Sequence, residues 1–185
     1  MFILYGPLIG LLVGLALGGR LSGLAEARIR WFPAIAAAMG VQLLLFGPLA
    51  SLIEPGDLLA VAAFLGSSAL GLAAAAMNIR QPGLALLTGG ALLNLAAILA
   101  NGGVMPASAE ALAVLGWNGD HTDFSNSAHV AAPALAGLTD VFALPRWLPF
   151  ANVFSLGDIL IAAGCGTFVA FSMLRTQAAS WAGDA

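Results

Sequence analysis

Five long apolar stretches separated by short polar breaks dominate the pattern along the chain. They cover residues 3–19, 33–53, 58–77, 83–100 and 153–174. Each is close to the roughly 20 residues that an α-helix needs to cross a hydrocarbon core about 30 Å thick. Because lipid offers the backbone no hydrogen-bond partners, helix is the expected state of each stretch. The pattern therefore predicts an all-α fold, a polytopic transmembrane helix bundle of about five spans that forms a single membrane domain over residues 1–185.

The composition also favours a membrane protein. The 185 residues are 61% hydrophobic and 8% charged, with a mean hydropathy of +0.98, whereas soluble domains carry about 25% charged residues. All six basic residues are arginines, and they are scattered in a chain of net charge -3. No basic stripe is present to follow a nucleic-acid backbone, so nucleic acid is excluded as a partner and the lipid bilayer is the expected one.

The arginines predict the orientation of the spans. With five spans, one side of the membrane receives five of them: Arg20, Arg28, Arg30, Arg80 and Arg175. Arg146 alone falls on the other side. The positive-inside rule makes the arginine-rich side cytoplasmic. We therefore expect the N-terminus and the loop 101–152 to lie outside and the C-terminus to lie in the cytoplasm.

The loop 101–152 is the one substantial piece outside the predicted spans, and it is too small for a domain of its own. Ser108 is placed to cap a short helix over residues 109–115, with Gly116 as its terminator. A second short helix is predicted over residues 134–142. These short helices would cover the outer face like a lid.

Three polar residues recur every third position at the outer end of the fifth span: Asn152, Ser155 and Asp158. They could converge on a ligand, or Asn152 could simply cap the helix. If the span begins near Val153, Asp158 lies about 8 Å inside it, and a central acid costs roughly 2.5 to 3.5 kcal/mol. Asp158 should therefore have a partner, and Arg146, the one outer arginine, is the expected one.

Further polar residues lie within the other spans. Asn94 and Asn101 are seven residues apart, on one helix face. Hydrogen bonds between helices would explain them. Together with Gln42 and Asp158 they could instead line a polar cavity that opens outward. The sequence leaves both interpretations open.

The two histidines, His121 and His129, lie in the outer loop near Asp120 and Asp123. Their spacing fits no recognised zinc pattern, so a solvated acidic turn is the favoured interpretation. A metal or pigment site on one of these histidines stays open as a weaker alternative. The sequence identifies no cofactor.

Small residues follow one face of the first span, where Gly6, Gly10, Gly14 and Gly18 recur every four residues. Such a face lets two helix backbones approach closely in lipid. Similar spacing recurs in the third span, at Ala63, Ser67, Gly71 and Ala75, and in the fifth, at Ala162, Gly166 and Ala170. The glycine face could pack within the chain, against another membrane subunit or in a homo-oligomer.

Two stretches resemble the signature motifs of a family of uncharacterised bacterial multi-pass membrane proteins that has only a domain-of-unknown-function label. Residues 101–106 read NGGVMP, and residues 148–158 read LPFANVFSLGD. The resemblance extends over most of the chain. It implies a multi-pass protein of the bacterial cytoplasmic (inner) membrane with an extracytoplasmic loop before its last helix, and it brings no activity to transfer.

Enzymatic function is disfavoured, because the chain contains no His-Glu-x-x-His, no Gly-x-Ser-x-Gly and no pair of acids at catalytic spacing. The favoured hypothesis is a non-catalytic structural or accessory membrane subunit that packs through small-residue helix faces. The alternative is a small transporter, or a protein that binds lipid headgroups or solutes at an outward-facing polar site around Asp158.

Overall fold

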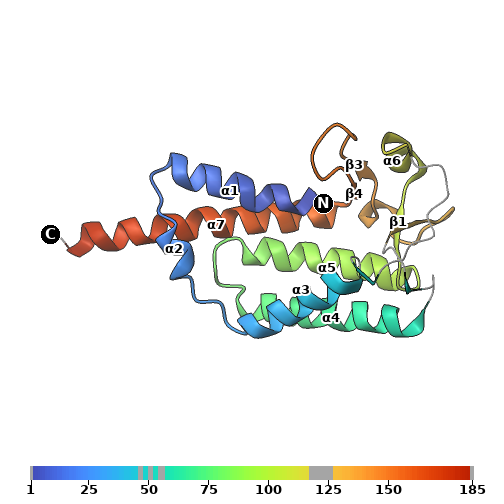
Figure 1. The fold of residues 1–185 in the computed structure, drawn as a ribbon, viewed down its shortest axis with the longest axis horizontal. Helices are drawn as coiled ribbons and strands as arrows, with labels where there is room; N and C mark the ends of the chain where they lie inside the picture. Colours follow the sequence, from blue (N-terminus) through green and yellow to red (C-terminus); the bar gives the residue numbers. More distant parts are fainter. Residues whose placement is uncertain (1, 46–47, 50–51, 54–56, 117–126, 184–185) are drawn as a thin grey trace.

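The chain folds into a mostly helical molecule in which five long helices lie lengthwise beside one another (Figure 1). The computed structural model describes residues 2–45, 48–49, 52–53, 57–116 and 127–183. The helices are η1 (Phe2–Leu4), α1 (Tyr5–Ala16), α2 (Ser22–Ala25), α3 (Phe32–Leu45), α4 (Leu58–Met77), α5 (Leu84–Ala100), α6 (Ala109–Val114), η3 (Ala136–Leu138) and α7 (Leu156–Gly183). The strands are β1 (Met105–Ala107), β2 (Ser127–His129), β3 (Phe142–Ala143) and β4 (Val153–Phe154).

Helix α7 occupies the middle of the arrangement. It packs against α1 on one side and α5 on the other, and α4 then joins α5 to α3. Helix α1 begins beside the start of α7, and the two helices run parallel (Figure 1). Helices α3 and α5 run in the opposite direction to α4. The chain therefore traverses the length of the molecule five times.

The observed helices follow the predicted spans with four differences, one of which is that α7 continues to Gly183, beyond the predicted end at 174. Helices α4 and α5 agree with the prediction to within one residue. Helix α1 ends at Ala16 because Gly18 turns the chain with φ of 83°. The described part of the second span is helical only as far as Leu45, and α7 begins at Leu156 because the two residues of β4 pair with β3.

Among the described residues, two helices are long and apolar enough to cross a membrane by length and composition, at 58–77 and 156–175. Three shorter apolar helices accompany them, at 2–16, 32–45 and 84–100.

The segment between α5 and α7 is more irregular than the predicted pair of short helices. Helix α6 forms as expected, with the Ser108 side chain accepting a hydrogen bond from the Ala111 amide and Gly116 following at φ of 61°. The predicted helix over 134–142 is wrong, since only the single turn of η3 forms there. The Asp140 backbone instead pairs with its neighbours across β1, donating to the Pro106 carbonyl and accepting from the Ser108 amide.

Two short strand pairs complete this segment. β1 and β2 are parallel, whereas β3 and β4 are antiparallel with Phe142 opposite Phe154. We call the end of the molecule that carries these strands and α6 the capped end.

Two asparagines at helix C-termini fasten distant backbone segments to the helix ends. The Asn78 side chain, after α4, accepts from the Arg30 amide and donates to the Arg30 carbonyl, both at 2.8 Å. Asn101, after α5, binds both backbone groups of Ala134 in the same way, at 2.9 Å. Each asparagine also donates to the carbonyl four residues earlier in its own helix. One amide side chain thus ends a helix and docks a remote residue.

Glycines bring the backbones of α1 and α7 into contact. A Cβ atom added at Gly6 or Gly10 would overlap the backbone carbonyl of Ala162 or Gly166, and one at Gly14 would lie 2.7 Å from Met173 Sδ. The small-residue faces of the first and fifth stretches therefore meet within the chain.

Gly18, the fourth glycine of the sequence pattern, departs from this arrangement. It lies beyond the end of α1 and is exposed, because the helix has already ended at Ala16. The buried Gly19 continues the contact in its place, next to Met173.

The other side of α7 meets α5 through a second glycine contact. A Cβ at Gly90 would overlap the Gly157 carbonyl, and a Cβ at Gly164 would lie 2.6 Å from the Gly83 carbonyl oxygen. Gly83 takes φ of 83° at the start of α5, a conformation that glycine adopts without cost. Close approach on two sides fixes α7 between its neighbours.

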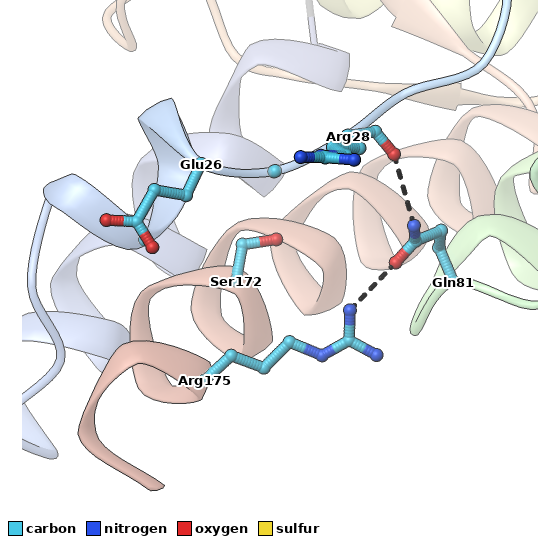
Figure 2. A pocket seen from close by; sticks show the side chains of 7 residues that line it. Glu26, Arg28, Gln81, Ser172 and Arg175 are labelled. Atoms are coloured by element: carbon cyan, nitrogen blue, oxygen red, sulfur yellow. Dashed lines mark hydrogen bonds between the residues drawn. The ribbon is translucent and has the colours of Figure 1, made fainter. Parts of the chain in front are cut away.

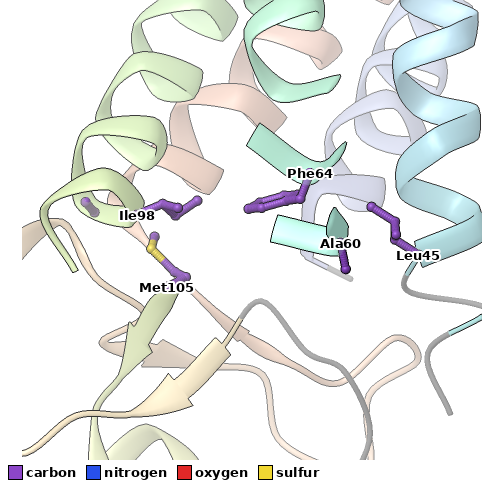
Figure 3. Close-up of a cluster of buried hydrophobic side chains, with 6 residues drawn as sticks. Leu45, Ala60, Phe64, Ile98 and Met105 are labelled. Carbon is purple, nitrogen blue, oxygen red and sulfur yellow. The ribbon is translucent and has the colours of Figure 1, made fainter. Parts of the chain in front are cut away.

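The largest buried apolar cluster lies toward the capped end, where α3, α4 and α5 meet β1 (Figure 3). Phe64 of α4 lies at its centre, facing Ile98 of α5 and Met105 of β1. The full set is Leu45, Ala60, Phe64, Ala97, Ile98 and Met105.

The outward faces of the long helices are apolar as well. Leu58 and Leu59 at the start of α4 are 82% and 80% exposed, and Leu43 of α3 is 65% exposed. Only about a third of the central residues of α7, and fewer in α4, are buried within the chain. These helices thus carry far more apolar surface than their contacts cover.

Substitution of Gly10 by alanine should destabilise the protein by about 1 to 3 kcal/mol, because the new methyl group forces α1 away from α7. Gly40→Ala in α3 is the matched control, since nothing lies within 4 Å of the added Cβ. The control should be neutral or gain up to about 1 kcal/mol from reduced backbone entropy. Unfolding of both variants in detergent micelles measures the difference, and equal stability would contradict the contact.

Candidate functional site

Ser155 and Asp158 form a reciprocal cap at the N-terminus of α7. Ser155 Oγ accepts from the Asp158 amide at 3.1 Å, and Asp158 Oδ2 accepts from the Ser155 amide at 3.1 Å. This is the capping-box arrangement, in which two free amides of the first turn are satisfied by side chains. Asp158 lies in the first turn of α7, where the helix dipole favours an acid. The predicted depth of about 8 Å assumed a helix that begins near Val153, whereas α7 begins at Leu156.

Asn94 of α5 joins this cap and links the two helices. Its Nδ2 donates to Asp158 Oδ1 at 2.7 Å, and its Oδ1 accepts from the Ser155 hydroxyl at 2.8 Å. Gly157 makes the approach possible, since a Cβ there would overlap Asn94 Oδ1. We call Asn94, Ser155 and Asp158 the polar clamp.

Every polar atom of the clamp side chains has a partner within the clamp. Ser155 is fully buried, and Asn94 and Asp158 are half-buried. A fully satisfied network of this kind rigidifies a helix contact, because breaking any bond leaves a buried group unpaired. Its chemistry is therefore suited to holding α5 and α7 together.

The expected contact between Asp158 and Arg146 is not made. The carboxylate is occupied by Asn94 and the Ser155 amide. The Arg146 guanidinium lies against Gly116 instead, where an added Cβ would be 2.8 Å from Nη1. The capping box and Asn94 thus provide the partners of Asp158, and the predicted arginine contact is wrong.

The other predicted polar residues lie in different places. Asn152 Oδ1 accepts from the Phe2 amide at 2.7 Å and so ties the N-terminus to the start of β4. Asn101 docks Ala134, as described above. Gln42 donates to Ser67 and Ser68 hydroxyls between α3 and α4. These side chains and the clamp thus serve four separate contacts.

The predicted histidine site lies largely beyond what the structure describes. His121, Asp120 and Asp123 fall outside the described residues, and of His129 only the backbone, in β2, is described. Among the described residues, no group of three or more His, Cys, Asp or Glu side chains is placed to hold a metal ion.

A second polar site, which the sequence analysis did not identify, lies at the opposite end of α7 (Figure 2). We call this end the arginine end, because it carries the five arginines that fall on one side of the predicted spans. A pocket of about 350 Å³ opens there between α2, the α4–α5 turn and α7, lined by Gly23, Glu26, Ala27, Arg28, Gln81, Ser172 and Arg175. Arg175 Nη1 donates to Gln81 Oε1 at 3.1 Å, and Gln81 Nε2 donates to the Arg28 carbonyl at 3.2 Å.

Comparison with known proteins places the chain in a family. The model described as "Family of unknown function (DUF5317)" matches residues 26–170, well over half of the chain. The chain belongs to this family. No curated protein and no solved structure gives a match.

The DUF5317 segment runs from the residue after α2 to near the middle of α7 and contains the whole polar clamp. Helix α1 precedes it, so the glycine contact joins a helix outside the matched segment to one inside it. Membership in a family of unknown function identifies no activity for the chain.

Replacement of Ser155 by alanine should lower the free energy of unfolding by about 1 to 3 kcal/mol, because it removes a helix cap and leaves Asn94 Oδ1 unpaired. Thr167→Ala is the control in the same helix, since the Thr167 hydroxyl bonds only to the Ala163 carbonyl of α7. The control should change stability by no more than about 0.5 kcal/mol. Denaturant unfolding of both variants tests this, and a stability loss confined to Thr167→Ala would contradict the role of the clamp.

Proposed function

We propose that the chain is a non-catalytic integral membrane protein that crosses the bacterial cytoplasmic membrane five times and serves as a structural or accessory subunit. The observation that carries this proposal is the apolar outer surface of a bundle in which the side chains of the polar clamp pair with one another. Such a molecule needs lipid around it, and the clamp side chains are occupied by one another.

The exposed side chains support embedding in lipid. Large apolar residues cover the outside of α1, α3, α4 and α5 along their length. Soluble monomers rarely expose contiguous apolar patches larger than a few hundred Å². Hydrocarbon removes the cost of this exposure, because it is as apolar as leucine.

The helix lengths support five crossings, more strongly for some helices than for others. Helices α4 and α7 are long enough to cross, and the 17 residues of α5 lie at the lower limit. The helical parts of the first and second stretches, 2–16 and 32–45, are shorter. Apolar residues continue beyond each, with Leu17 after the first and Leu49, Leu52 and Ile53 after the second.

The ends of the bundle support the orientation. Arg28, Arg30 and Arg175 all make their bonds around the α4–α5 turn, at the arginine end. Trp31 is exposed near the arginine end, and Trp147 is exposed at the capped end. Positive charge on one side and tryptophan at both interfaces are typical of membrane proteins. The arginine end is accordingly assigned to the cytoplasm.

The polar clamp favours a structural role over transport. A transporter site needs side chains whose bonds are completed by the solute. Asn94, Ser155 and Asp158 instead complete one another's bonds, and Gln42 and Arg146 lie elsewhere. The outward-facing solute site around Asp158 is therefore the weaker of the two functional hypotheses.

Single cysteines at the two ends should react from opposite sides of the membrane. With Cys165 replaced by serine, Glu110→Cys in α6 should react with a membrane-impermeant maleimide in intact cells or right-side-out vesicles. Ser22→Cys in α2 should react only after permeabilisation, because five crossings place the exposed positions 22 and 110 on opposite sides. Labelling of both from one side would contradict the five-span topology, and the reverse pattern would contradict the orientation.

An accessory subunit should leave the membrane together with other protein. Extraction in a mild detergent, followed by light scattering with subtraction of the detergent mass, should give a protein mass well above the 18.6 kDa of one chain. Mass spectrometry of the same fraction separates a homo-oligomer from a complex with other subunits. A homogeneous 18.6 kDa species from gently extracted membranes would contradict the accessory role.

A further inference from the structure

The pocket at the arginine end gathers polar groups from three segments that are distant in the sequence. Arg28 follows α2, Gln81 lies in the α4–α5 turn, and Ser172 and Arg175 lie one turn apart on α7 (Figure 2). The DUF5317 segment ends at residue 170, so two of the lining side chains come from the part of α7 just beyond it.

Ser172 is the most informative residue of this pocket. It is 7% exposed, and among the described residues its hydroxyl has no hydrogen-bond partner. In Figure 2 the hydroxyl points into the space surrounded by Arg28, Gln81 and Arg175. A buried hydroxyl without a partner costs about 1 to 3 kcal/mol, so its presence here indicates a ligand that completes its bond.

The charges around Ser172 indicate the sign of that ligand. Within the described part of the chain, neither Arg28 nor Arg175 forms an ion pair, and Arg175 donates only to Gln81. Glu26 contributes one negative charge to the lining, on the side away from Gln81 (Figure 2). Two guanidinium groups against one carboxylate leave the pocket with a net positive charge that favours an anion.

The Gln81 contacts hold the Arg175 guanidinium and the Arg28 backbone in place. Because Gln81 accepts from Arg175 and donates to the Arg28 carbonyl, one side chain connects both segments across the pocket. This tie explains the position of Gln81 but gives no role to the Arg28 guanidinium or the Ser172 hydroxyl. Guanidinium forks and a hydroxyl donor together match the oxygens of a phosphoryl group.

We propose that this pocket binds a phosphoryl group through Arg28, Arg175 and Ser172, supplied by the headgroup of an anionic phospholipid or by soluble phosphate. The phospholipid source rests on the proposed function, since that function places the arginine end at the cytoplasmic surface of the bilayer, where anionic headgroups lie. Binding of soluble phosphate does not depend on the membrane, so the two sources can be tested separately.

The test of the phospholipid source uses the full chain, reconstituted into phosphatidylcholine vesicles with and without phosphatidylglycerol. After gentle extraction, native mass spectrometry measures the phosphatidylglycerol retained per protein. The double variant Arg28→Gln with Arg175→Gln should retain about tenfold less, because bonds to a charged group are lost, and Ser172→Ala about fivefold less. Arg80→Gln removes one charge at the same end without touching the pocket, and it should stay within about twofold of the unmodified protein.

The test of the soluble source measures the binding of inorganic phosphate to the delipidated protein in detergent by titration calorimetry. Phosphate binding that is weakened in the pocket variants, without retention of phosphatidylglycerol, would assign the soluble source. Equal phosphatidylglycerol retention and equal phosphate binding in the pocket variants and Arg80→Gln would overturn the site. Ser172→Ala changes no charge, so it keeps the test valid if the double variant fails to fold.

Failure of the site and failure of the proposed function have different signatures. A chain that does not enter the vesicles at all would contradict the membrane proposal, and the binding of inorganic phosphate could still be measured on it. A chain that enters the vesicles normally but shows no dependence on Arg28, Arg175 or Ser172 would contradict the site alone.

Discussion

The close approach of the α7 backbone to α1 on one side and α5 on the other is the contact on which the rest of the structure depends. Gly6, Gly10, Gly90 and Gly164 leave no room for a side chain at these contacts. In the lipid environment that we propose for this chain, helices would associate through such close packing and through interhelical hydrogen bonds, because burial of apolar surface would not drive them together. The polar clamp supplies those bonds at the capped end, and it can form only because Gly157 lets Asn94 approach.

Much of this fold follows from the sequence, and the parts that do not follow depend on distant partners. Apolar stretches of helical length located α4 and α5 closely, and Ser108 and Gly116 marked the ends of α6 correctly. Hydropathy could not show that β4 pairs with β3, so the start of α7 was placed too early and Asp158 too deep. The expected Arg146 contact followed from that error, because a carboxylate in the first turn finds its partners locally.

The candidate sites also differ in how far the local sequence predicts them. The polar spacing at the start of α7 was visible in the sequence, and capping was one of its two interpretations. The predicted cap was Asn152, however, whereas Ser155 caps the helix and Asn152 accepts from the Phe2 amide, because α7 begins three residues later than predicted. The pocket at the arginine end was not visible, since Arg28, Gln81 and Ser172 belong to three segments that only the tertiary fold brings together. Among the described residues, the two ends of α7 therefore differ. The clamp side chains pair with one another at the capped end, whereas the Ser172 hydroxyl and the Arg28 guanidinium at the other end form no hydrogen bond or ion pair.

Disulfide formation between residues 2 and 154 in native membranes tests the central claim most directly. The Phe2 and Phe154 rings are stacked with centroids 4.1 Å apart, while the other end of α1 lies near Met173, where the Arg20 amide donates to the Met173 carbonyl. In a Cys165→Ser background, Phe2→Cys with Phe154→Cys should cross-link efficiently, and Phe2→Cys with Leu174→Cys should not. A cross-link between positions 2 and 174, or none between 2 and 154, would contradict the parallel packing of α1 and α7.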